Sequence, residues 1–238
     1  MRLGVIFELK SLGFWGIGRE TFEADAVTCK HRLPSGTEVI GIRGAYVKGL
    51  LRSKAYLLAP LLEKTGAISY VSNLECHVKK TCGQCIVCKV FGYSGSSLSP
   101  LAVSDFYSIK SDKAEEIYRM GLEKALIEEK DFFDNPPLAY ITRVKIHDIS
   151  QRAAEGGLYT YEHVSPGALF YGEIKLREKL LEGVSYKDAC LLTLVSLAAL
   201  KYFYAGRKTL VTPVIVGYEP PNLVKYDLIK IVLDKLKR

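Results

Sequence analysis

The side chains best suited to bind a metal lie between residues 76 and 92 of this chain. Cys82, Cys85 and Cys88 follow one another at three-residue intervals, and His77 precedes the first of them by five positions. Thiolates and imidazoles are the ligands that structural zinc prefers, and four of them complete its tetrahedral shell. We therefore expect a structural zinc held by His77, Cys82, Cys85 and Cys88, with Cys76 as the alternative to His77.

A redox pair and ordinary buried thiols are two other interpretations of these cysteines. A Cys-x-x-Cys redox motif normally has two cysteines near a strand-to-helix turn and lacks the neighbouring histidine. Gly83 allows the tight backbone of a metal-binding knuckle, and Lys79, Lys80 and Lys89 would offset thiolate charge. Because no position is obviously left for water, structural zinc is favoured over catalytic zinc.

The composition indicates a folded protein with a basic surface. The chain has 238 residues, 48% of them hydrophobic, and a formal net charge of +7 with a pI of about 9.0. The charge suggests a polyanionic partner, although basic surfaces are also common in proteins that bind nothing acidic. The first ten residues become charged too soon for a secretory signal, and the longest apolar run, 189–200, is too short for a membrane span. We expect a soluble, cytoplasmic protein with reduced cysteines.

Apolar periodicity and turn residues divide the chain into alternating strands and helices. Strands are expected at 3–9, 39–42, 102–109, 140–147, 169–176 and 210–218, and helices at 45–62, 186–204 and 226–237. Residues 113–129 are expected to be helical or loosely structured, and the polar stretch 151–167 to form a projecting hairpin. This order fits an α+β, ferredoxin-like core with insertions better than a doubly wound parallel sheet.

Several segments resemble one family in a consistent order. Residues 42–53 (IRGAYVKGLLRS) are similar to the Gly-Ser-Ser-x-Lys-Gly-x-x-Arg-Ser segment of RAMP-superfamily proteins in CRISPR systems, and 82–92 (CGQCIVCKVFG) to the zinc knuckle and following Phe-Gly of their type III backbone subunits. The resemblance continues through 142–146, 157–159, 162–164, 167 and 170–174. It covers most of the chain, from residue 1 to about 217.

The resemblance implies a modified RNA-recognition core that binds guide RNA and packs side by side along it. It implies a single RAMP domain over 1–238, with a zinc-knuckle insertion at 66–104 and a thumb hairpin at 148–168. The expected partners are CRISPR guide RNA, target RNA, other effector-complex subunits and further copies of the chain, with no membrane.

Two departures from the family pattern suggest a diverged paralogue. Where the family carries a glycine-rich loop before its last core strand, this chain has only Gly206, Arg207 and Lys208. Arg207 and Lys208 are RNA-binding candidates at this reduced loop. The chain also has Ile146, His147 and Asp148 where the family commonly shows Ile-Asp-Arg.

Basic residues in two places are candidates for RNA contact. Lys48 and Arg52 are four positions apart, so they share one face of the expected helix, and Arg43 lies just before it. These cations and the helix N-terminus could hold phosphates without reading sequence. Arg152 in the hairpin, with Tyr159 and Tyr161, could wedge against splayed bases. The alternatives are a solvated basic face and a polar surface hairpin.

Asp25 is the candidate catalytic residue, because its register resembles that of the loop aspartate with which catalytic family members cut target RNA. A carboxylate there could recruit a divalent ion such as magnesium and help align a ribose 2′-hydroxyl for in-line attack. His31 is close in sequence and could assist as a base. The alternative is an inert loop acid.

The residues together with the resemblance therefore imply a zinc-stabilised guide-RNA-binding subunit of a type III CRISPR effector, expected to cut target RNA through Asp25. Three rivals remain: a non-catalytic structural paralogue, a guide-processing RAMP endoribonuclease, and a zinc-dependent binder of duplex DNA. The chain has no Walker loop, no dinucleotide-binding glycine motif followed by an acidic residue, and no nucleophile elbow.

Overall fold

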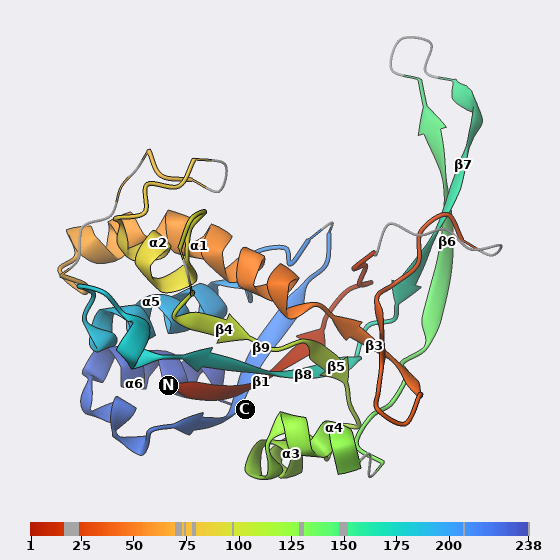
Figure 1. Ribbon diagram of the computed structural model, residues 1–238. Helices are drawn as coiled ribbons and strands as arrows, with labels where there is room; N and C mark the ends of the chain where they lie inside the picture. The colour runs from red at the N-terminus through yellow and green to blue at the C-terminus, as the bar shows by residue number, and fades with distance from the viewer. Residues whose placement is uncertain are drawn as a thin grey trace.

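A seven-stranded antiparallel sheet forms the centre of the protein in the computed structural model (Figure 1), which describes residues 1–16, 24–69, 73, 75–77, 80–96, 98–128, 131–147, 152–206 and 208–237. Strand β1 (Arg2–Leu9) lies between β8 (Leu169–Leu176) and β9 (Val211–Glu219). The other edge of β8 pairs with β4 (Leu101–Val103) and β5 (Phe106–Ser108). The sheet continues through β3 (Glu38–Ile42) to β2 (Lys30–Arg32).

Helices cover both faces of this sheet (Figure 1). On one face lie α1 (Gly44–Lys64), α2 (Ile86–Phe91), α5 (Tyr186–Ala199) and α6 (Asp227–Leu236). On the other lie α3 (Ala114–Met120) and α4 (Leu122–Glu128). Two short 3₁₀ turns, η1 (Glu178–Leu180) and η2 (Pro221–Lys225), complete the connections. No helix in the described part of the chain is long and apolar enough to cross a bilayer.

The order of these elements confirms the predicted α+β, ferredoxin-like core. The chain runs β1, α1, β4 and β5, β8, α5, β9, and the strands lie side by side as β5–β8–β1–β9. That arrangement is two β-α-β halves interleaved in one antiparallel sheet. The predicted strand at 102–109 is split, because Ser104 and Asp105 interrupt the strand between β4 and β5.

Alternation along the central strands divides the interior into two apolar layers. Leu3, Val5 and Phe7 of β1 point into the main core beneath the helices, whereas Ile6 joins a smaller core against α3 and α4. Successive strand side chains point to opposite faces, so one strand can supply both layers. Helix α5 is buried on most sides because it packs between α1 and α6 and shares the main core with the sheet, which explains its lack of a polar face.

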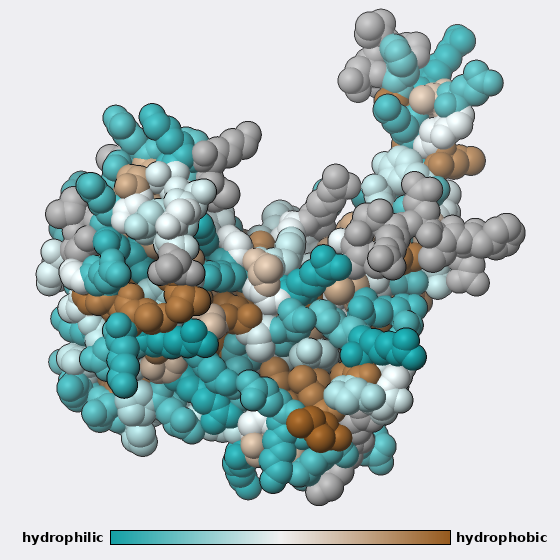
Figure 2. All heavy atoms as spheres, viewed as in Figure 1, coloured by the Kyte–Doolittle hydropathy of each residue, from teal (hydrophilic) through white to brown (hydrophobic). Residues whose placement is uncertain are grey.

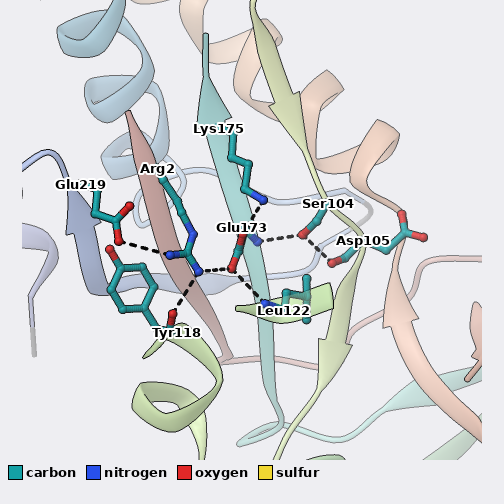
Figure 3. A network of polar contacts seen from close by, with 8 residues as sticks. All are labelled: Arg2, Ser104, Asp105, Tyr118, Leu122, Glu173, Lys175 and Glu219. Atoms are coloured by element: carbon teal, nitrogen blue, oxygen red, sulfur yellow. Dashed lines mark hydrogen bonds and ion pairs between the residues drawn. The ribbon is translucent and has the colours of Figure 1, made fainter. Parts of the chain in front are cut away.

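A buried carboxylate fixes the face of the sheet that carries α3 and α4 (Figure 3). Glu173 of β8 is 2% exposed and accepts from Arg2 at 2.7 Å, from Lys175 at 2.9 Å and from the Leu122 N–H at 3.1 Å. Burial alone would raise the pKa of Glu173, but these donors outweigh it and lower the pKa. The paired carboxylate therefore joins β1, β8 and the start of α4.

A two-stranded hairpin projects from the body and has a sheet of its own (Figure 1). It consists of β6 (Leu138–Ile146) and β7 (Ala153–Val164). The space-filling view shows a narrow arm with mainly hydrophilic and intermediate residues (Figure 2). The predicted strand at 140–147 pairs with β7 rather than with the core, so the hairpin begins earlier than 148, and 148–151 lie outside the described residues.

The predicted insertion at 66–104 is tied to the core at its far end. Helix α2 buries Ile86, Val87, Val90 and Phe91 in the main core, and β4 pairs with β8. The metal-binding segment is thus continuous with core packing.

Candidate zinc knuckle and nucleic-acid interface

Four cysteine thiols converge where the chain enters α2. The Sγ atoms of Cys76, Cys82, Cys85 and Cys88 all lie within 4.8 Å of one another, and those of Cys76 and Cys88 are 3.4 Å apart. A zinc tetrahedron with bonds of about 2.3 Å has sulfur–sulfur edges of roughly 3.8 Å. Four thiols at these separations can therefore bind one zinc ion.

Backbone N–H groups point at the sulfur atoms, as expected where thiolates form. The Cys82 N–H donates to Cys76 Sγ at 3.3 Å, and the N–H groups of Gln84 and Cys85 donate to Cys82 Sγ at 3.4 and 3.2 Å. Gly83, with φ of +71°, makes the turn that aims these donors inward. Burial alone would raise the pKa of Cys82, but the N–H donors outweigh it and lower the pKa to about 6.

The structure gathers Cys76, the alternative that the sequence left open, with the three other cysteines. His77 is exposed and is not part of the cluster, and its backbone pairs with Lys80. Adjacent side chains in an extended segment point in opposite directions, so only one of the two can face the cluster. Burial raises the pKa of both Cys76 and Cys85, and a bound dication would favour their thiolates.

Tyr56 connects the cluster to helix α1. Its hydroxyl lies 3.7 Å from Cys76 Sγ and accepts from Arg52 Nε and Nη2 at 3.2 and 3.0 Å. Arg52 and Tyr56 are four positions apart, so they lie on one face of α1. Tyr56 therefore links the cysteine cluster, through Cys76, to Arg52, the predicted RNA-binding arginine.

A basic groove runs between α1 and the chain that follows α2. Lys48 and Arg52 line one wall, around a volume of about 420 Å³. The other wall consists of Phe91, Gly92, Tyr93, Ser96 and Ser99. Burial lowers the pKa of Lys48, and Arg52 adds to that shift. Within the described part of the chain neither cation has a carboxylate at ion-pair distance. Two unneutralised cations in a groove make an anion-binding surface.

A second hollow, of about 390 Å³, lies at the N-terminus of α1. Arg43, Cys29 and the aromatic rings of Phe14, Trp15 and Tyr46 are among the residues that line it. Asp105 fixes this end of the helix, because its Oδ1 accepts from the Gly44 N–H at 2.7 Å. Arg43 is exposed beside this hollow, whereas Lys48 and Arg52 line the groove one to two turns further along.

Sequence comparison identifies the family. A model of the RAMP superfamily matches residues 34–211, which span β3, α1, the cysteine cluster, the hairpin and α5. This chain belongs to the RAMP superfamily. No curated protein sequence matches it.

One solved structure similar to this RAMP protein is a chain of the type III-B Cmr-beta complex bound to cognate target RNA, determined by cryo-EM. The identity is 13%, the TM-score is 0.46, and the match covers 75% of this chain and 85% of the other. Similarity at this level carries no weight for function.

The other predicted RNA-binding residues of this RAMP protein are spread over the surface. Lys208 is exposed, and Arg207 lies outside the described residues. Arg152 is exposed at the far end of the hairpin, where its carbonyl accepts from the His147 N–H at 2.9 Å. The Tyr159 and Tyr161 rings pack edge to face with centroids 5.2 Å apart. These groups are not gathered into the groove with Lys48 and Arg52.

Asp25 lies against the hairpin of the RAMP fold. Its Oδ2 accepts from the Thr160 N–H, and its own N–H donates to the Thr160 carbonyl at 2.9 Å. The side chain remains exposed, and Oδ1 has no hydrogen-bond partner among the described residues. His31 instead contacts Cys29 and Asp105, so Asp25 and His31 are held by different partners.

Sequence reasoning missed Tyr56, Asp105 and the second wall of the groove, from Phe91 to Tyr93 with Ser96 and Ser99. Tyr56 could have been found, because it follows Arg52 by one helical turn. Asp105 and the second wall lie far from α1 in the sequence, and only the folded chain brings them to this helix.

Proposed function

We propose that this RAMP protein is a guide-RNA-binding backbone subunit of a type III CRISPR interference complex, acting as one RAMP domain over 1–238. The observation that carries the proposal is the groove in which Lys48 and Arg52 face a neighbouring wall, with no neutralising carboxylate among the residues that the structure describes. Target RNA, other subunits and further copies of the chain are its proposed partners.

The groove suits a polyanion that is bound without regard to sequence. Lys48 is half-buried, and its lowered pKa reflects the cost of a cation removed from water beside a second cation. A phosphate placed there would relieve both effects. Contacts to the backbone alone would let one subunit accept many guides.

We assign one structural zinc to Cys76, Cys82, Cys85 and Cys88. All four tetrahedral positions would be taken by sulfur, which leaves none for substrate. The zinc would order α2, and through Cys76 and Tyr56 it would hold Arg52 at the groove. Metal binding and RNA binding would therefore be linked in this chain.

The hairpin is the proposed thumb, with Arg152, Tyr159 and Tyr161 as groups that stack against or pair with RNA. An isolated two-stranded hairpin is marginally stable in water, so contact with RNA or a neighbouring subunit would stabilise it. Arg43 would add a contact near the N-terminus of α1, and Arg207 and Lys208 remain proposed RNA contacts at the reduced loop before β9.

Cleavage of target RNA through Asp25 is the catalytic part of the proposal. The exposed carboxylate keeps Oδ1 for a divalent ion such as magnesium, while Thr160 orients Oδ2. The rival functions are a non-catalytic paralogue with the same groove and a guide-processing endoribonuclease. The processing enzyme would cut free guide precursor without target RNA, which separates it from the other two.

RNA binding by the double variant Lys48→Gln/Arg52→Gln tests the groove. Each lost phosphate contact should reduce the salt slope of single-stranded RNA binding by about 0.7, so the double variant should lose about 1.4. The matched control, Lys230→Gln/Lys235→Gln, removes the same charge from exposed positions on α6. Equal losses in both variants, or no loss in either, would contradict the proposal, as would preferential binding of duplex DNA.

A further inference from the structure

A thiol, an imidazole and a carboxylate form a hydrogen-bonded line at the edge of the sheet. Cys29 Sγ lies 3.6 Å from His31 Nε2, and His31 Nδ1 lies 3.2 Å from Asp105 Oδ2. Cys29 and His31 are two positions apart along an extended segment, so their side chains share one face. Asp105 reaches them from the two-residue break between β4 and β5.

The carboxylate fixes the imidazole in the orientation that a base requires. Asp105 is itself held, since its other oxygen accepts from the Gly44 N–H at 2.7 Å. Burial lowers the pKa of His31, and Asp105 opposes that shift, so the ring is neutral near pH 7. A neutral ring that donates from Nδ1 to Asp105 presents the lone pair of Nε2 to the Cys29 thiol. The His31 ring also packs against Tyr107, with centroids 5.1 Å apart.

The thiol borders a hollow large enough for a small molecule. Cys29 is one of the residues lining the 390 Å³ hollow at the N-terminus of α1, together with Arg43, Trp15 and Tyr46. Burial raises the pKa of Cys29, and the Arg43 guanidinium opposes that shift. The hollow is therefore apolar on its aromatic side and positive at Arg43, since the Asp105 carboxylate already occupies the first N–H of the helix. A metal site is a poor alternative, because only Cys29 and Nε2 face the same side.

We infer that Cys29 is a thiol–disulfide exchange site that accepts small disulfides bearing carboxylates, of which glutathione disulfide is the test case. The Cys29 sulfur attacks one sulfur of the disulfide while its proton passes to His31 Nε2. The disulfide bond breaks, and the departing thiolate takes the proton from His31. The products are a mixed disulfide on Cys29 and one free thiol. This inference does not depend on RNA binding.

The site is tested by exposing the zinc-loaded full-length chain to glutathione disulfide and mapping the modified cysteine by peptide mass spectrometry. Bound zinc would protect the four clustered thiols. Cys190 is the internal reference, because it is fully buried in α5 and, among the described residues, Tyr186 rather than a histidine bonds its sulfur. We expect Cys29 to react at least about tenfold faster than Cys190, and His31→Gln to slow Cys29 at least about tenfold. Asp105→Asn keeps an acceptor for Gly44 but removes the charge beside His31, and it should also slow the reaction.

The preference for anionic disulfides is tested by measuring the reaction rate with a second disulfide of opposite charge. Arg43→Gln should lower the rate with glutathione disulfide more than the rate with cystamine, whose charge is positive. If Cys29 is modified no faster than Cys190, the inference is overturned. This comparison is made in the unmutated chain, so it does not depend on the folding of any variant. An unchanged rate in both His31→Gln and Asp105→Asn would overturn the role of the hydrogen-bonded line.

Discussion

Removal of zinc from the cysteine cluster should destabilise the whole core, because α2 belongs to both. The four α2 side chains Ile86, Val87, Val90 and Phe91 are each at most 2% exposed. Exposing them would cost roughly 1.5–3 kcal/mol each, or about 6–12 kcal/mol together. That is comparable to the whole stability of a typical domain, about 5–15 kcal/mol. Zinc binding, at about 10–16 kcal/mol in zinc-finger peptides, is large enough to hold α2 in place.

The assay is thermal unfolding with zinc content measured on the same samples. At about 2–4 °C per kcal/mol for a chain of this size, loss of α2 packing should lower Tm by at least about 10 °C. Cys76→Ser should lose zinc and show this shift, whereas His77→Asn, at the adjacent exposed position, should keep both zinc and Tm. A metal-free protein whose Tm stays within about 2 °C of the loaded form would refute the reasoning. Loss of zinc in His77→Asn alone would assign the fourth ligand to His77.

Three further predictions concern the sheet, the helix and the loop acid. Glu173→Gln should lower the free energy of unfolding by about 2–4 kcal/mol at neutral pH. Because the pKa of Glu173 is lowered from 4.5 in the folded state, this difference between the two proteins should be present above about pH 4.5 and should disappear as the pH falls further, as measured by urea unfolding. Gly44→Ala should destabilise the protein in thermal unfolding, since a Cβ there would lie 2.4 Å from the Ser104 carbonyl oxygen, whereas Gly49→Ala, with nothing within 4 Å, should stabilise it by up to about 1 kcal/mol. Asp25→Asn in the assembled, guide-loaded complex with magnesium should abolish one or more regularly spaced cuts in target RNA while binding is retained; an unchanged cutting pattern would leave the chain as a scaffold.

The parts of the cysteine cluster and of the groove that could be predicted are those whose residues lie close together in the sequence. Cys82, Cys85 and Cys88 lie within one turn and the start of one helix, and Lys48 and Arg52 share a helical face, so sequence spacing alone placed each set. The choice between Cys76 and His77 depends on which side chain faces inward, and the sequence does not specify that direction.

Long-range pairing was harder to predict. The alternation of 140–147 is equally consistent with a core strand and with one arm of a free hairpin, and only its register with β7 decides between them. The contact between His31 and Asp105 joins segments separated by α1 and the cysteine cluster, so no local pattern signals it.

The most direct test of guide binding is to purify this chain from its native cells and sequence the RNA that accompanies it. The proposed function predicts RNAs that share a repeat-derived segment and differ in their guide segments, and it predicts that Lys48→Gln/Arg52→Gln reduces their yield relative to Lys230→Gln/Lys235→Gln. Recovery of no RNA, or of unrelated cellular RNAs in equal amounts from both variants, would contradict it.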